Sequence, residues 1–297
     1  MPFPRTISTY EPRDVRVAFS ALMEVAAALQ AYREAMVLIG GWVPYLLLQQ
    51  HQSPGNPFRH VGSLDSDWVI DPRKIDEGEY DTIVKMLKRR GFVESREIKY
   101  RLTKGCPVPG KSAALEVAVD LLTRAPQTGR GKPQRHRRIQ PDLAARAADW
   151  ADVALSHSCD KMLDGELPGG GNIQLPIRMA DVVGLVGTKG LALGRRYEEK
   201  DNYDLYAVIA NYGEGPVEVA RMVKPFARVP SLRPSLEKIR TWYADVNAAG
   251  PAMVARFYDR EEGDARLRRI RDAFEILDRF LQELGLRAAD TADGPVD

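Results

Sequence analysis

The sequence predicts an α+β fold, with a mixed β-sheet flanked by helices and then a mainly helical C-terminal domain. Over the first part of the chain, short apolar runs of strand length alternate with amphipathic segments in which apolar residues recur at helical spacing. From Met179 onward the helical spacing dominates. These patterns predict an α/β domain in residues 1–170 and a mainly helical domain in residues 171–297.

Composition indicates a protein of the cytosol. The 297 residues include 43 basic and 41 acidic side chains. The net charge of +2 is too small for the overall electrostatic field to indicate nucleic-acid binding. The two cysteines, Cys106 and Cys159, are too few for a disulfide framework and fit a reducing compartment. No apolar run approaches the roughly 18 residues of a membrane span, and no signal peptide is recognisable. We therefore expect a cytoplasmic protein.

The N-terminal half is expected to alternate helices and strands. The spacing of apolar residues predicts helices over residues 12–33, 42–50 and 76–90. Apolar or alternating runs predict strands over residues 36–39, 65–70, 92–103, 113–122, 150–158 and 172–177. Two segments without apolar periodicity, rich in polar residues, proline and glycine, predict exposed loops over residues 51–58 and 124–138.

The C-terminal half is expected to consist of helices. Apolar residues recur at helical spacing over residues 179–195, 199–211, 216–223, 232–243 and 262–286. The last residues, from 288 to 297, are polar and weakly patterned, so we expect them to fray.

Two aspartates at the start of the strand expected at residues 65–70 are the strongest candidates for chemistry. Asp65 and Asp67 alternate along an extended backbone, so both carboxylates are expected on one face of the sheet. Two anions this close repel each other unless a cation lies between them, and Mg²⁺ commonly bridges carboxylates to nucleotide phosphates. A third carboxylate is expected from a neighbouring strand, where Asp120 is preferred. Glu116 shares the strand and the face of Asp120 but lies four residues earlier, roughly 13 Å from it along the strand.

A glycine pair precedes these acids. Gly40 and Gly41 end the apolar run at residues 36–39 and open the helix expected at residues 42–50. Because they lack a Cβ, they allow backbone N–H groups to approach a phosphate closely. Together with the acids, the pair indicates a site for nucleotidyl transfer.

The order of these features resembles a known superfamily. A glycine pair before a helix, the Asp65-x-Asp67 motif and Asp120 on a later strand resemble the nucleotidyltransferases that include DNA polymerase beta. In the C-terminal half, a lysine-bearing helix at Thr188-Lys189 is followed by a KD-x-x-DLY helix at residues 200–206. This pair of helices resembles the AbiEii-like family of nucleotidyltransferase toxins. The resemblance covers roughly residues 36–212.

The resemblance implies a role for each matching residue. Two Mg²⁺ ions would be bound by Asp65, Asp67 and Asp120, with Asp120 acting either as a ligand or as the base for the attacking hydroxyl. Asp204 would orient Lys189 or the acceptor, and Lys189 would pair with phosphates. Contacts to the nucleotide are implied for Gly40, Gly41, Ser63, Lys189, Arg196 and Asp201. The catalytic set is therefore Asp65, Asp67, Asp120, Lys189 and Asp204.

The resemblance also implies substrates and partners. A nucleoside monophosphate would pass from ATP, GTP, CTP or UTP to an RNA acceptor, with the 3′ end of tRNA as the expected site. The protein would be the toxin of a toxin–antitoxin or phage-defence system, with an antitoxin encoded separately.

A basic segment follows the strand of Asp120. Its cations, with no acid among them, include Arg130, Lys132, Arg135, Arg137 and Arg138. Near the expected site, they are suited to salt-sensitive and sequence-blind contacts with an RNA backbone. A solvated loop without a ligand is the alternative interpretation.

Two other functions stay open at this point. The string Gly40-Gly41-Trp42 also resembles the start of aminoglycoside and lincosamide nucleotidyltransferases, which modify small antibiotics. A non-catalytic module that binds a nucleotide or RNA is the other alternative, although such a module gains nothing from three clustered acids. The four histidines show no metal-ligand spacing, so no zinc site is predicted.

Overall fold

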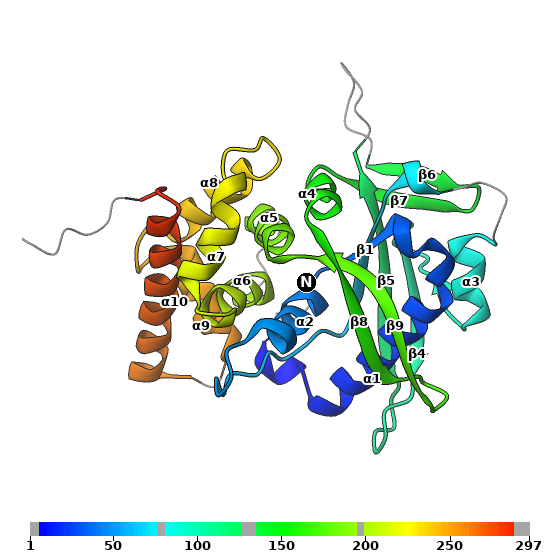
Figure 1. Ribbon diagram of the computed structural model, residues 1–297. Coiled ribbons are helices and arrows are strands. Elements are labelled where there is room, and N and C mark those ends of the chain that lie inside the picture. The colour runs from blue at the N-terminus through cyan, green and yellow to red at the C-terminus, as the bar shows by residue number, and fades with distance from the viewer. Residues whose placement is uncertain (1–5, 76–80, 126–134, 195–198, 260, 288–297) are drawn as a thin grey trace, which may run out of the picture.

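The computed structural model describes residues 6–75, 81–125, 135–194, 199–259 and 261–287. A mixed β-sheet with helices packed against it forms one side of the molecule, and the C-terminal helices form the other (Figure 1). The predicted α+β fold, in which a mixed sheet is followed by a mainly helical part, is confirmed. Among the helices of these ranges, none combines the length and the hydropathy needed to cross a bilayer.

One sheet contains the nine strands found in the described residues. These strands are β1 (Met36–Ile39), β2 (Ser66–Ile70), β3 (Val93–Glu94), β4 (Arg101–Cys106), β5 (Leu115–Arg124), β6 (His136–Gln140), β7 (Leu143–Ala148), β8 (Ser158–Glu166) and β9 (Asn172–Ala180). Seven of them follow in the order β3-β4-β5-β2-β1-β9-β8, while β7 pairs with the last part of β5 and carries β6 as its other neighbour. Because β2 is antiparallel to β1 and parallel to β5, the sheet is mixed.

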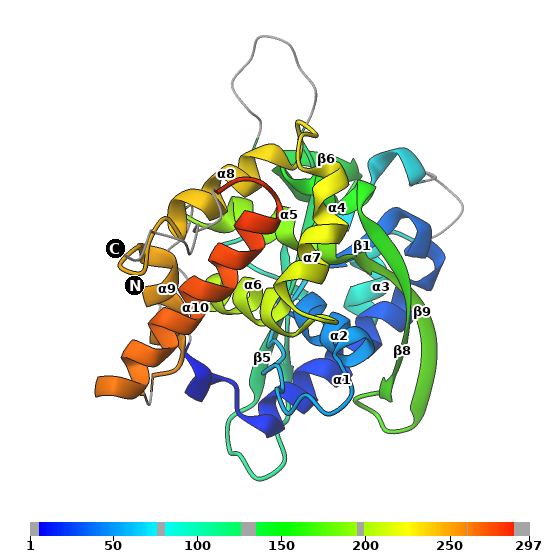
Figure 2. The same cartoon turned by 60° about the vertical axis from the view of Figure 1, so that its left-hand side comes forward.

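Helices cover the sheet and form the C-terminal part. Those associated with the sheet are α1 (Pro12–Ala28), α2 (Trp42–His51), α3 (Ile83–Arg89) and α4 (Ala151–Ser156). Those of the C-terminal part are α5 (Val182–Ala192), α6 (Glu199–Asn211), α7 (Pro216–Val223), α8 (Arg233–Trp242), α9 (Ala249–Phe257) and α10 (Gly263–Glu283). The long helix α10 packs across α6, α7 and α9 (Figure 2).

The centre of the sheet positions the glycine pair. All four residues of β1 are buried, as expected for an apolar strand with a neighbour on each edge. The strand ends at Gly40, whose φ of 78° lies in the left-handed region that favours glycine. Helix α2 begins two residues later with the fully buried Trp42, so the chain turns sharply between strand and helix.

The predicted domain boundary falls inside a β-hairpin. Strands β8 and β9 pair antiparallel from Ser158↔Ala180 to Glu166↔Asn172, so the hairpin spans residue 170. Strand β9 then lies parallel to β1 in the middle of the sheet. The sheet therefore extends to Ala180, and the helical part begins with α5 rather than at residue 171.

Several short elements differ from the prediction. The segment expected to be a strand at residues 150–158 contains the helix α4, because an apolar run this short fits the spacing of a helix as well as that of a strand. The strand expected at residues 92–103 is divided into β3 and β4 by a turn in which the Ser95 hydroxyl accepts hydrogen bonds from the N–H groups of Glu97 and Ile98. Strands β6, β7 and β8 and helix α9 were not predicted. Strand β6 begins inside the segment expected to be a loop, β7 is rich in alanine, and β8 is rich in charged residues.

The helices expected at residues 12–33 and 76–90 are shorter than predicted. Helix α1 ends at Ala28 and passes into a 3₁₀ segment at Gln30–Ala35. Helix α3 covers Ile83–Arg89, and residues 76–80 lie outside the described ranges, as do residues 288–297. These differences leave the order of helices and strands around the glycine pair and the acids unchanged.

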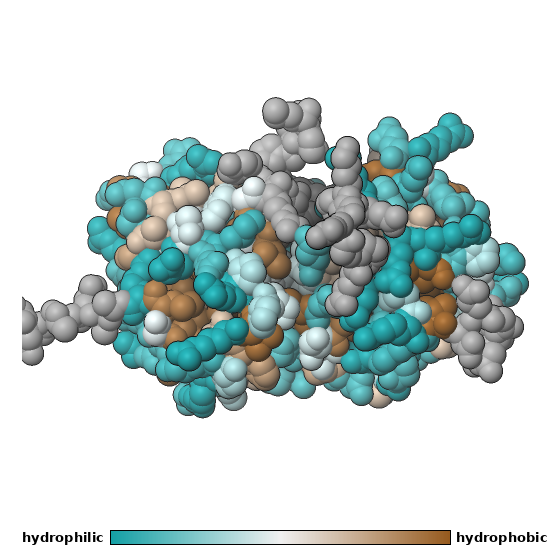
Figure 3. Space-filling view, turned by 90° about the horizontal axis from the view of Figure 1, so that it is seen from above, coloured by the Kyte–Doolittle hydropathy of each residue, from teal (hydrophilic) through white to brown (hydrophobic). Residues whose placement is uncertain are grey.

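The surface seen from above is mostly hydrophilic, with apolar residues in separate small patches (Figure 3). The apolar residues are instead gathered in a core that runs through both parts of the molecule, from Val37 and Val69 in the sheet to Phe280 in α10. This shared core packs the helical part directly against the sheet.

Candidate active site

Two of the predicted acids lie on neighbouring strands at the same level. Strands β2 and β5 are parallel, and Asp67 and Asp120 are paired in their register. Residues at paired positions of adjacent strands share a face of the sheet, so the two carboxylates point to the same side. Both side chains are partly buried and line one cavity.

The cavity lies between the sheet and the helical part. Its lining includes Ile39 and Gly40 from the end of β1, Asp67 and Asp120, Leu122, Arg146, Trp150, and, from the helical part, Thr188, Lys189, Ala192 and Asp201. Its volume is about 110 Å³, below the roughly 300–1,000 Å³ of pockets that enclose a whole small ligand. A nucleotide bound here would therefore keep part of its surface outside. A larger hollow of about 730 Å³, between α1 and the loops after β4 and β8, contains none of the predicted site residues.

Gly40 is required by the position of Asp67. A Cβ at Gly40 would lie 2.1 Å from Asp67 Oδ2, so the carboxylate packs directly on the glycine backbone. Gly41 is similarly close to Ser63, whose Oγ would lie 2.6 Å from an added Cβ. The glycine pair thus makes room for an acid and a hydroxyl, and Ser63 itself is buried rather than part of the cavity lining described here.

Replacing Gly40 is expected to be costly. Gly40→Ala should lower the free energy of unfolding by roughly 2–4 kcal/mol, because it combines a left-handed backbone with a collision against Asp67. Gly55→Ala is the matched control, since Gly55 has a φ of +87° with no atom within 4 Å of an added Cβ. Strain alone should cost that variant about 1–2 kcal/mol. Urea unfolding measures both variants, and equal losses would show that Asp67 makes no tight contact with Gly40.

Asp120 is held by an arginine that the sequence reasoning did not select. Arg101, the first residue of β4, is the register partner of Asp120 on the other edge of β5. Its Nε donates to Asp120 Oδ1 over 2.6 Å and its Nη2 to Asp120 Oδ2 over 2.8 Å. This hydrogen bonding raises the pKa of Arg101 above its ordinary value, although partial burial opposes the rise. The negative charge of Asp65 also contributes to the raised pKa of Arg101.

The three acids do not form a metal centre as their side chains lie. Within the described ranges, no group of three or more histidine, cysteine, aspartate or glutamate side chains is arranged to hold a metal ion. Asp67 and Asp120 share the cavity, whereas Asp65 is absent from its described lining. Both oxygens of Asp120 are already bound by Arg101, so this carboxylate does not fit the role of a ligand in the present arrangement.

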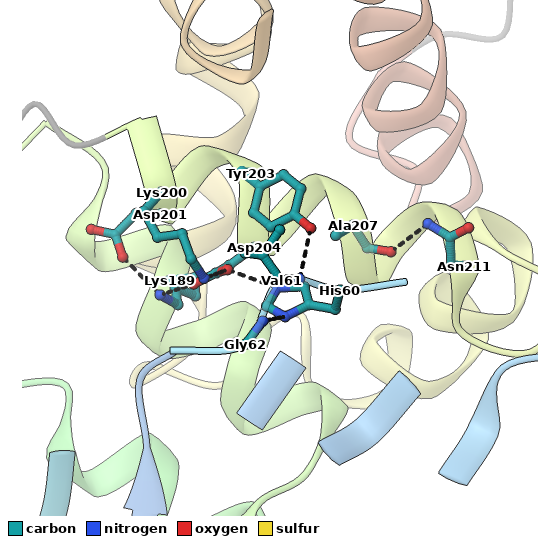
Figure 4. Close-up of polar contacts among 10 residues, drawn as sticks. All are labelled: His60, Val61, Gly62, Lys189, Lys200, Asp201, Tyr203, Asp204, Ala207 and Asn211. Carbon is teal, nitrogen blue, oxygen red and sulfur yellow. Dashed lines mark hydrogen bonds and ion pairs between the residues drawn. The ribbon is translucent and has the colours of Figure 1, made fainter. Parts of the chain in front are cut away.

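A buried network of charged groups holds Lys189 at the cavity. Lys189 on α5 donates to Asp201 Oδ1 over 2.8 Å and to Asp204 Oδ2 over 2.6 Å, both on α6 (Figure 4). Asp204 Oδ1 also accepts from Lys200 and from His60 Nε2, the latter over 2.9 Å. Asp204 is fully buried, so it can orient Lys189 but cannot reach an acceptor molecule. Two roles were implied for Asp204, to orient Lys189 or to orient the acceptor. Its contacts match the first of them.

Charges within the network balance one another. Burial by itself would lower the pKa of Lys189, but the carboxylates of Asp201 and Asp204 outweigh it and raise that pKa. Burial would raise the pKa of Asp204, but the neighbouring ammonium groups of Lys189 and Lys200 lower it well below its usual range. The pKa of Lys200 is lowered to about 8, chiefly by burial, with Asp204 acting against the shift. Two cations thus face two anions around a shared centre.

His60 completes the network as a neutral ring. Burial, followed by the positive charge of Lys200, lowers the pKa of His60 to about 4. The N–H of Gly62 donates to His60 Nδ1 over 3.1 Å, so the ring proton is on Nε2 and is donated to Asp204. His60 and Lys200 were not predicted as site residues. Lys200 could have been found from its place in the KD-x-x-DLY pattern, whereas His60 joins the site only through a tertiary contact.

The stability of the protein is expected to depend on pH through His60. Its pKa is about 4 in the folded protein and about 6.5 in an unfolded chain. The unfolded chain therefore binds more protons between these values, and the free energy of unfolding should fall by roughly 3 kcal/mol as the pH is lowered from 6.5 to 4. Urea unfolding across this range measures the slope. In His60→Gln, the free energy of unfolding should change distinctly less with pH. An unchanged pH dependence in that variant would show that His60 is not the group responsible.

Some predicted residues lie outside the described ranges, namely Arg196, Arg130 and Lys132. Arg135 is exposed, and Arg137 and Arg138 belong to the strand β6 rather than to the predicted loop. Strand β6 pairs with β7, whose Arg146 lines the cavity and is paired in register with His136. The basic residues of β6 are therefore one strand away from the candidate site.

Comparison with family models, with curated proteins and with solved structures gave no match to this chain.

Proposed function

We propose that this chain is a nucleotidyltransferase that transfers a nucleoside monophosphate from an NTP to an RNA acceptor. The observation that supports this proposal is the cavity in which Asp67 and Asp120 lie at one level of the sheet, opposite Lys189 of the helical part. Acids and a fixed cation facing one space suit a reaction in which a hydroxyl is activated and a polyphosphate is held. The sequence order of these residues, which resembles the AbiEii-like toxins, agrees with the proposal.

Lys189 is suited to contact the triphosphate. An ammonium group carries three donors, and Asp201 and Asp204 use two of them. Among the described residues, no further partner of the ammonium is found, which leaves the third donor for a ligand in the cavity that Lys189 lines. Because the two carboxylates fix the ammonium, little side-chain freedom is lost when a phosphate binds.

The reaction proposed is an in-line displacement at the α-phosphorus. A hydroxyl oxygen of the acceptor forms a bond to this phosphorus, and the bond to the oxygen of the leaving pyrophosphate breaks. The proton of the hydroxyl passes to one of the cavity carboxylates, Asp67 or Asp120. Mg²⁺ is part of the proposal. Of the acids expected to bind it, Asp67 and Asp120 line the cavity, and Asp120 would first have to leave Arg101.

An RNA acceptor is favoured by the cations beside the cavity. Arg146 lines it, Arg137 and Arg138 lie on the neighbouring strand β6, and Arg135 directly precedes that strand. Arg138 shares the face of Arg146, because alternate residues of paired strands lie on one side, and cations spaced in this way suit the phosphates of a nucleic-acid backbone better than a small antibiotic. We include in the proposal that the acceptor is the 3′ end of tRNA and that the protein is a toxin controlled by a separate antitoxin.

The test is transfer of label from each of the four α-labelled NTPs to total tRNA by the purified protein with Mg²⁺. Label in the RNA with at least one NTP, and growth arrest on expression, are expected. A panel of aminoglycosides and lincosamides tests the small-molecule alternative in the same assay. NTP binding without transfer to any acceptor would contradict the proposed activity and support a binding module instead.

A further inference from the structure

The salt bridge between Arg101 and Asp120 places a constraint on the candidate site. Both oxygens of Asp120 accept from the guanidinium of Arg101, at 2.6 and 2.8 Å. A bidentate pair of this kind fixes both groups in one plane and is among the stronger ion pairs. While it persists, both oxygens of Asp120 are engaged by Arg101, and the carboxylate is not free to bind a metal ion.

The pair also compensates charge in the absence of a ligand. Asp67 and Asp120 occupy paired positions on adjacent strands, where two like charges destabilise each other. Arg101, at the opposite edge of β5, supplies the neutralising charge. A metal ion that accompanied a bound NTP would supply positive charge beside the two acids, so the compensation by Arg101 would no longer be needed there.

Arg101 is placed so that it can exchange partners. Its side chain is 32% exposed, whereas that of Asp120 is 13% exposed. A phosphate group can accept two parallel hydrogen bonds from a guanidinium, as a carboxylate does. A triphosphate in the cavity would therefore offer Arg101 an equivalent partner.

We propose that Arg101 is a positioning residue that covers Asp120 in the free protein and moves to the phosphates of the bound nucleotide, which uncovers Asp120. This inference rests on the proposed function, since it takes a triphosphate as the ligand. It gives the bidentate contact of Arg101 with Asp120 a function, because it makes Asp120 available only when a nucleotide is present.

The first experiment measures Mn²⁺ binding without nucleotide, by electron paramagnetic resonance, for the wild type and three variants. Arg101→Gln is expected to bind Mn²⁺ at least ten-fold more tightly than the wild type, and the gain should vanish in Arg101→Gln/Asp120→Asn. Arg146→Gln is the matched control, because Arg146 lines the cavity, whereas Arg101 only contacts the cavity residue Asp120, and Arg146 donates to the hydroxyl of Tyr100. It removes the same charge without uncovering Asp120 and should stay within about three-fold of the wild type. Equal gains in Arg101→Gln and Arg146→Gln, or no gain in either, would overturn the proposal.

The second experiment measures the binding of inorganic triphosphate by calorimetry in the presence of EDTA. Arg101→Gln should weaken this binding about ten-fold, and Arg101→Lys should weaken it less, because it keeps the charge without the bidentate geometry. Arg101→Lys also serves if Arg101→Gln does not fold, and it should then show an intermediate gain in Mn²⁺ affinity. Unchanged triphosphate binding in both variants would overturn the proposal that Arg101 moves from Asp120 to the phosphates. Because neither readout depends on turnover, failure of the transfer assay with success here would reject the proposed function alone.

Discussion

Asp67→Asn is expected to abolish nucleotidyl transfer, with a loss of at least about a thousand-fold in rate, while the fold is retained. The asparagine has the size of aspartate, so it fits against Gly40 without a new collision. It removes one of the carboxylates among the described lining residues, the groups that the proposed reaction uses to accept the proton of the attacking hydroxyl. Transfer of label to tRNA measures the activity, and thermal unfolding measures the fold.

The control for this variant is Glu116→Gln on strand β5. Glu116 is an exposed acid on the same strand as Asp120, outside the cavity, so its loss should change the transfer rate less than about two-fold. A rate for Asp67→Asn within ten-fold of the wild type would remove Asp67 from the catalytic residues. The toxin hypothesis adds a second readout, because expression of Asp67→Asn should then permit normal growth.

Lys189→Met is expected to destabilise the protein by about 3–5 kcal/mol, which corresponds to a fall in Tm on the order of 10 °C. The reason is that Asp201 and Asp204 would lose a shared cation while they remain buried. The same variant should lose transfer activity, since the cation facing the cavity is gone. Urea unfolding and the transfer assay measure the two effects separately.

Two further variants distinguish the effect of disrupting the buried network from the effect of removing a lysine charge anywhere on the protein. Lys85→Met removes an exposed lysine on the helix α3 and should change the free energy of unfolding by no more than about 0.5 kcal/mol. Lys189→Met/Asp201→Asn removes one cation and one anion together, so it should recover part of the lost stability. It should not recover activity. A double variant less stable than Lys189→Met would show that Asp201 is not compensated mainly by Lys189.

The main features of the candidate site could be predicted because they depend on local sequence. The run at residues 36–39 followed by Gly40 fixes a strand and its end, and the apolar residues after Asp67 fix the strand that carries it, whereas Asp65 precedes this strand and is absent from the described cavity lining. The helices α6 and α7 begin and end at the predicted residues, because their apolar spacing is regular and their ends carry acidic residues, proline or glycine. Placing Asp120 beside Asp67 required only that two apolar strands be neighbours.

The parts that were missed depend on contacts between distant segments. Arg101 pairs with Asp120 across the antiparallel strands β4 and β5, and nothing in its local sequence distinguishes it from nearby cations such as Arg96 and Lys99. His60 reaches Asp204 from a loop 144 positions earlier in the chain. Short elements of mixed composition, such as β7 and α4, take their form from the sheet beside them rather than from their own periodicity.

The hairpin of β8 and β9 determines how the molecule can be dissected. Strand β9 is the parallel neighbour of β1, and the chain continues from it directly into the helix that carries Lys189. A fragment ending near residue 170 would expose an edge of β1 and leave the lysine on the other piece. The two halves are consequently not interchangeable modules, and recombination between related chains at this point would separate the residues that face one another across the cavity.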